Sequence, residues 1–176
     1  QHSFKPVDQT SSQINPNGIR TAVSLYLNNP QLAIFKFGKI EHWDVSEITD
    51  MSYLFQYHNN SNLFTANISN WNVSNVKNFS FMFLNQSLFN QDLSKWNISS
   101  GNAFLTGMFS GCVNFYQTLS GNFALYFKTF NFVVFKNSPG KIFNTIKNSS
   151  GDVYINISPL QKTKIILQAL DDGFSF

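Results

Sequence analysis

The stretch Trp71-Asn72-Val73-Ser74-Asn75-Val76 has a close copy on either side of it. Trp43-Asp44-Val45-Ser46-Glu47-Ile48 begins 28 residues earlier, and Trp96-Asn97-Ile98-Ser99 begins 25 residues later. In each copy the tryptophan is followed by a small polar residue, a β-branched residue and a serine. A recurring period of this length indicates a repeat architecture, in which one unit buries its apolar residues against the next.

Apolar residues recur in register around each tryptophan. Isoleucine or leucine stands three residues before it, and an apolar group after it ends in phenylalanine. A partial fourth unit, Phe115–Asn122, matches Phe89–Trp96 but has asparagine in place of the tryptophan. We therefore expect a structural ladder through the stacked units, consisting of Trp43, Trp71, Trp96, Phe55, Phe83 and Phe109.

Each unit is predicted to run strand, turn, short helix, turn. Ser46 and Ser74 stand where a side chain would cap the first turn of a helix. The apolar residues that follow each serine are spaced to lie on one helical face. The first unit also carries about three extra residues near positions 57–61, which indicates a loop insertion.

These units resemble the BspA-like class of leucine-rich-repeat surface proteins. Phe89–Phe109 is similar to their motif Phe-Asn-x-Asp-(Leu/Ile)-Ser-x-Trp-(Asp/Asn)-Val-Ser, and Met108–Cys112 is similar to its ending, Met-Phe-x-x-Cys. The resemblance implies a right-handed α/β solenoid on a cell surface or in a secreted product, with a role in adhesion or molecular contact. It brings no catalytic motif with it. The missing fourth tryptophan and the absence of cysteine from the first two units depart from the pattern.

The segments on either side of the repeats differ in character. Residues 1–14 indicate an extended arm, residues 15–37 a helical cap, residues 38–122 the repeats, and residues 123–176 a β-rich C-terminal module. Within the cap, Asn15-Pro16 and Asn29-Pro30 are predicted helix starts, and Gly38 a helix end. The predicted fold class is therefore α/β: a short LRR-like right-handed solenoid with an N-terminal helical cap and a C-terminal antiparallel β-meander.

Catalytic, metal and cofactor chemistry find no support in the pattern, and we expect no enzyme. The three histidines do not stand at the spacing from Cys112 that metal ligands have. We interpret Cys112 as a small buried residue. Asp44, Asp50 and Asp92 recur in the repeat frame, and we interpret them as turn-forming residues in preference to a calcium site. A single arginine argues against nucleic-acid binding, and no apolar run is long enough for a membrane span.

Asn-x-Ser/Thr sequences, the acceptors of N-glycosylation, occur eight times. One interpretation is a glycoprotein of a secretory pathway. The other is capping chemistry in a chain rich in asparagine, and the pattern does not separate the two. Asn59 and Asn148 are the favoured acceptors because they fall in predicted loops; the others are Asn67, Asn72, Asn78, Asn85, Asn97 and Asn156.

The pattern thus predicts a non-enzymatic extracellular or cell-surface protein, whose repeats form a protein–protein contact or adhesion scaffold. The alternative is a structural subunit of a larger assembly, either a virion shell or a cell-surface appendage. Charged residues make up only 12% of the chain and aromatic residues 16%, which favours this alternative. In either case the expected partners are proteins, including copies of the chain itself or other subunits of an assembly.

Overall fold

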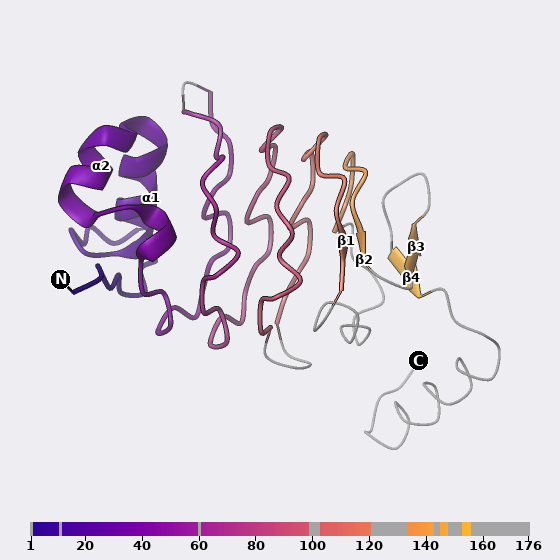
Figure 1. Ribbon diagram of the computed structural model, residues 1–176, viewed down its shortest axis with the longest axis horizontal. Coiled ribbons are helices and arrows are strands. Elements are labelled where there is room, and N and C mark those ends of the chain that lie inside the picture. Colours follow the sequence, from indigo (N-terminus) through magenta and orange to yellow (C-terminus); the bar gives the residue numbers. More distant parts are fainter. Residues whose placement is uncertain are drawn as a thin grey trace, which may run out of the picture.

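The computed structural model describes residues 2–10, 12–59, 61–98, 103–120, 134–142, 145–147 and 153–155. Helices α1 (Ile19–Asn28) and α2 (Pro30–Phe37) pack together at the N-terminal end, and the 3-10 helix η1 (Ile40–His42) follows them. From there the chain makes successive irregular passes that lie side by side (Figure 1). Four short strands follow: β1 (Thr118–Leu119), β2 (Lys141–Ile142), β3 (Thr145–Lys147) and β4 (Val153–Ile155).

The predicted fold class is wrong. In the described part of residues 43–117 there is no helix and no extended strand, so the units are not the strand–turn–helix units of an LRR-like right-handed solenoid. The strand-like pairing between the described parts of these units is limited to isolated β-bridges, Asp50 with Asn78 and Asn78 with Phe104. The C-terminal antiparallel meander is also wrong, because β1 and β2 pair in parallel and the antiparallel pair β3–β4 is only three residues long.

The backbone hydrogen bonds explain why no helix forms in the units. The amides of Phe55 and Tyr57 donate to carbonyls of the second unit at 2.8 and 2.9 Å. The amides of Leu54 and Gln56, each directly before one of these two residues, donate to the carbonyls three residues earlier in the chain. A helix would instead direct every amide to the carbonyl four residues earlier. The apolar spacing that we interpreted as a helix face is therefore produced by consecutive turns that alternate with bonds to the next unit.

Two kinds of turn in the repeat have their third residue in the left-handed region of backbone space, the signature of a type II turn, whereas the turn from Tyr53 to Gln56 does not. In the first turn of the three units this residue is Tyr53, Phe81 or Gly107, with φ of 57°, 55° and 61°. In a later turn, found in the second unit, the third unit and residues 135–138, it is Asn85, Gly111 or Asn137, with φ of 60°, 74° and 55°. The recurrence of one strained backbone position shows that the units share their conformation as well as their sequence.

The core is a stack of parallel phenylalanine rings. Centroids of successive rings in the row Phe55, Phe83, Phe109 and Phe135 are 5.6, 5.7 and 5.3 Å apart, with interplanar angles of 8° or less. A second row packs against the first and consists of Phe64, Phe89 and Phe115. All seven side chains are 0–1% exposed. Burial of each ring stabilises the fold by about 1.5–3 kcal/mol, and each ring pair adds roughly 0.5–1.5 kcal/mol.

The tryptophans connect neighbouring units through their indole N–H groups. Trp71 donates to the Ile40 carbonyl and Trp96 to the Ile68 carbonyl, both at 3.0 Å. Each acceptor stands three residues before the preceding tryptophan, so the repeated isoleucine supplies a buried side chain and a backbone acceptor. Trp43 has no preceding unit and donates to the Gly38 carbonyl at 3.2 Å.

Phe135 continues the stack beyond the last predicted unit. The Val134 and Lys136 carbonyls accept hydrogen bonds from Phe109 and Gly111 at 2.9 and 2.7 Å. Residues 134–138 therefore form a turn in the repeat register, within the segment predicted to belong to the β-rich C-terminal module. Most of the predicted C-terminal module, including residues 123–133 and 156–176, lies outside the described residues.

Helix α1 begins later than the Asn15-Pro16 pair predicts, because the N-terminal arm supplies its caps. The Val7 carbonyl accepts from the Ile19 amide, and the Gln9 side chain accepts from the Thr21 amide, both at 2.9 Å. The cap residue itself is a glycine, Gly18, which has no side chain to offer. The start and end of α2 are as predicted, with Asn29 as the N-cap, Pro30 at the first position and Gly38 at the C-cap.

Candidate functional site

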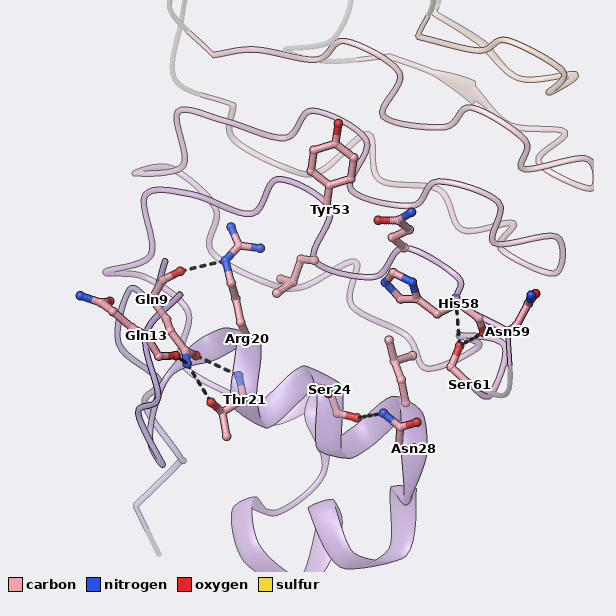
Figure 2. A pocket seen from close by; sticks show the side chains of 13 residues that line it. Gln9, Gln13, Arg20, Thr21, Ser24, Asn28, Tyr53, His58, Asn59 and Ser61 are labelled. Carbon is pink, nitrogen blue, oxygen red and sulfur yellow. Dashed lines mark hydrogen bonds between the residues drawn. The ribbon is translucent and has the colours of Figure 1, made fainter. Parts of the chain in front are cut away.

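A polar pocket of about 630 Å³ lies between α1 and the first repeat unit (Figure 2). The arm and α1 contribute residues such as Gln13, Arg20 and Asn28, and the first unit contributes Tyr53 and Gln56 among others. Two lining residues, Leu27 and Leu54, are buried apolar side chains. Its size falls within the range of small-molecule binding sites, and it combines apolar with polar surface as such sites do.

Arg20 is engaged by the protein itself. Its guanidinium donates to the Gln9 carbonyl at 2.8 Å and to the Ser52 carbonyl at 2.6 Å, and it lies 3.3 Å from the Asp50 carboxylate. The side chain is only 18% exposed. These contacts hold the arm and the first unit against α1, and Asp50 offsets the positive charge. Arg20 is therefore a positioning residue of the pocket.

Tyr53 stands at the edge of the pocket in an unusual conformation. Its φ of 57° is a true outlier for a bulky residue. The ring is stacked on Phe81 of the second unit at a centroid distance of 5.0 Å and an interplanar angle of 17°. Phe81 in turn covers Gly107 of the third unit, where an added Cβ would overlap its ring. The side chain of Tyr53 is nevertheless 48% exposed.

Several polar groups of the pocket are not used by the fold. The side-chain amide of Gln56, the hydroxyl of Ser24 and the Oδ1 atom of Asn28 form no hydrogen bond with another described residue. Gln9, by contrast, is 7% exposed and fully used, since it bonds to Thr21 twice and to the Gln13 carbonyl. The pocket therefore has a saturated polar group in Gln9 and open amide and hydroxyl groups on both walls, Ser24 and Asn28 on α1 and Gln56 on the first unit (Figure 2).

The described residues bring together no group of three His, Cys, Asp or Glu side chains that could hold a metal ion. Cys112 is completely buried and its thiol donates to the Phe83 carbonyl. Burial raises the pKa of this thiol to about 12, so it stays protonated at neutral pH and is not a nucleophile. None of the described helices is both long and apolar enough to cross a bilayer.

The Asn-x-Ser sequences of the repeats form Asx turns. The side-chain oxygens of Asn67, Asn72 and Asn78 accept the amide of the serine two residues later at 3.0–3.2 Å. Asp44, Asp50 and Asp92 accept the same bond at 2.8–3.1 Å. Because aspartate serves as well as asparagine, the position requires an acceptor oxygen and not an amide nitrogen. The predicted capping by Ser46 and Ser74 is wrong, since no helix follows either residue.

The remaining predicted acceptors are spread over the molecule. Asn59 is exposed and lines the pocket, which makes it the one predicted site residue found there. Asn85 and Asn97 are exposed on the second and third units, and Asn85 occupies a left-handed turn position. Asn148 and Asn156 lie outside the described residues. The structure therefore does not gather these residues into one site.

The pocket itself was missed by the sequence patterns. Arg20, Gln9 and Tyr53 line one pocket only because the arm folds back on α1, and no local sequence pattern predicts that arrangement. Tyr53 had a signal, because it aligns with Phe81 and Gly107 at a position where one unit carries glycine. A glycine exchanged for an aromatic residue in a repeat indicates a left-handed backbone with a special side chain.

No curated protein and no solved structure matches the chain. Residues 25–141, more than half of its length, match the family described as "Mycoplasma protein of unknown function, DUF285". The match spans α2, η1 and the stacked units through Phe135. The chain therefore belongs to the DUF285 family.

Proposed function

We propose that the chain is a non-enzymatic contact scaffold on a cell surface or in the extracellular space, and that its partners are proteins. The resemblance of Phe89–Phe109 to the BspA-like motif supports this proposal, and so does membership of the DUF285 family. We further propose that the family and the BspA-like surface proteins share this repeat.

The observation that carries the proposal is an exposed apolar patch on two adjoining units. Leu88, Val113 and Tyr116 are 52%, 50% and 69% exposed. The segments that carry them are tied together, because Asn114 donates to the Ser87 carbonyl at 2.8 Å and the Tyr116 amide donates to Asn90 at 3.0 Å. Three large apolar side chains displayed on a hydrogen-bonded frame are typical of a protein contact surface.

The test compares the wild-type chain with a variant in which Leu88, Val113 and Tyr116 are replaced by serine. Beads coated with the wild type should be retained on cell layers or on extracellular matrix proteins, and the triple variant should reduce retention several-fold. Phe35→Ser is the matched control, because Phe35 is 87% exposed but lies on α2. Equal retention of both coatings would refute the proposal.

The alternative is a structural subunit of a virion shell or a surface appendage. The same patch would then contact another copy of the chain. Native mass spectrometry of the purified chain over a range of concentrations separates the two functions. A monomer that adheres to other proteins supports the scaffold, whereas a defined oligomer that the triple variant dissociates supports the subunit.

A further inference from the structure

We propose that the pocket between α1 and the first unit binds a neutral saccharide, and that one pyranose ring of the ligand stacks on Tyr53. This inference does not depend on the proposed protein contact, because the apolar patch at Leu88, Val113 and Tyr116 lines no part of the pocket. It assigns a ligand class to a site that the repeat resemblance does not predict.

The first argument is the exposed ring face of Tyr53. One side of the ring is stacked on Phe81, which does not line the pocket, whereas Tyr53 does. Phe81 is held from behind by the backbone of Gly107. Tyr53 is thus a flat aromatic surface with a fixed support. The C–H face of a pyranose ring is apolar and flat, and it packs well on such a surface.

The second argument is the backbone strain at Tyr53. A left-handed conformation costs a residue with a side chain about 1–2 kcal/mol relative to glycine. The third unit avoids this cost with Gly107 at the equivalent position. Phe81 carries the same strain outside the pocket, so the turn itself requires this backbone, and what is particular to Tyr53 is that its strained position borders a cavity. Tyr53 is also the only left-handed residue in the described chain that lines the pocket.

The third argument is the hydrogen-bonding character of the open groups. The Gln56 amide offers both donors and an acceptor, the Ser24 hydroxyl can do either, and Asn28 Oδ1 accepts. Sugar hydroxyls also donate and accept, so they can pair with each of these groups. Two leucines, Leu27 and Leu54, add apolar surface to the pocket wall.

The fourth argument is charge. No aspartate, glutamate or lysine lines the pocket, and the charge of Arg20 is offset by Asp50 at 3.3 Å. Arg20 also directs its N–H donors to the Gln9 and Ser52 carbonyls, so it has no free pair of N–H groups with which to bind a carboxylate or phosphate. Removing water from a charged ligand without supplying a counter-charge costs much free energy. The hydroxyls of a neutral polyol cost less to desolvate, because hydrogen bonds with the pocket replace those with water.

The test is saturation-transfer NMR on the full 176-residue chain with four probes. These are the methyl glycosides of glucose, mannose, galactose and N-acetylglucosamine. We expect transfer to the ring C–H protons of at least one probe. Tyr53→Gly should weaken its binding about three- to tenfold, because the aromatic contact is lost. Glycine accepts the left-handed backbone at this position, so the variant is expected to fold, which a circular dichroism melt checks.

Two further variants make the test specific. Tyr53→Phe keeps the ring and should retain binding, and Phe104→Ala removes another exposed aromatic ring outside the pocket and should leave glycoside binding unchanged. The proposal is overturned if no neutral glycoside receives saturation, or if Tyr53→Gly has no effect. A sialoside and an oligoproline peptide are measured beside the four glycosides, and the proposal is equally overturned if Tyr53-dependent binding is seen only for one of these two. Bead retention by the apolar patch is measured separately, so either proposal can fail alone.

Discussion

The substitution Gln86→Leu tests how the fold accommodates the longer loop of the first unit. Gln86 is completely buried and connects two units. Its side-chain oxygen Oε1 accepts a hydrogen bond from the Phe64 amide at 2.8 Å, and its side-chain nitrogen Nε2 donates to the Phe55 carbonyl at 2.7 Å. Leucine has a similar volume but can form neither bond.

The reason for this arrangement lies in the spacing of the phenylalanines. In the second and third units the amides of Phe89 and Phe115 donate to backbone carbonyls three residues earlier, those of Gln86 and Cys112. Phe64 follows Phe55 by nine residues, whereas Phe89 follows Phe83 by six. The three extra residues remove the local acceptor, and the side chain of Gln86 replaces it from the next unit.

Gln86→Leu leaves one buried donor and one buried acceptor without a partner. Each unsatisfied group costs about 1–3 kcal/mol, so the free energy of unfolding should fall by roughly 2–6 kcal/mol. The three buried tryptophans report unfolding by fluorescence in urea. With an m value of about 2 kcal/mol/M, the midpoint should fall by roughly 1–3 M.

The control shortens the loop by deleting residues 58–60, which restores the six-residue spacing. Phe64 can then bond within its own unit, so Gln86→Leu should cost clearly less in this background, and a double-mutant cycle measures the coupling. The reasoning is refuted if Gln86→Leu changes stability by less than about 0.5 kcal/mol, or if its effect is the same with and without the deletion.

Three further outcomes follow from the turns and the core. Gly111→Ala should destabilise the fold by at least about 1 kcal/mol in the same urea assay, because φ is 74° and the new Cβ would overlap Asn85. Cys112 should resist iodoacetamide at pH 8 in the native state and react once urea unfolds the chain, because burial raises its pKa to about 12; rapid native labelling would contradict this. The Ser46 hydroxyl and amide lower the pKa of Asp44, so the stability it contributes is present above its unfolded pKa of about 3.9 and is lost as the pH falls through the lower folded pKa. Asp44→Asn should reduce the loss of stability in that acidic range, and an unchanged pH profile would show that the carboxylate contributes nothing.

The sequence contained the register of the repeat but not the conformation of the unit. The periodic tryptophans and phenylalanines are enough to align the units, because each must stack on its equivalent. They do not distinguish a short helix from two consecutive turns, since both place residues three positions apart on the same side. Hydrogen bonds between units determine which of the two conformations forms, and these bonds depend on the neighbouring copy.

The sequence patterns did not predict that the phenylalanine row continues to Phe135, for a related reason. Phe135 follows Phe109 by 26 residues, the same spacing as Phe109 from Phe83. The run Phe-Asn-Phe-Val-Val-Phe around it has strand propensity, which favours the β-rich module predicted for residues 123–176 over a further repeat unit. The better signal was Asn137, because asparagine at the position of Asn85 and Gly111 favours the left-handed turn that the structure has there.

The departures from the repeat indicate where function is to be sought. At one backbone position the three units carry Tyr53, Phe81 and Gly107, and all three have positive φ. Glycine meets that requirement without strain, so stability alone does not explain the two aromatic residues. Both lie at the N-terminal end of the stack, where the arm and α1 complete a pocket, and only Tyr53 lines it. Where a sequence breaks its own local rule beside an open cavity, a ligand contact is the physical explanation that such a break most directly supports.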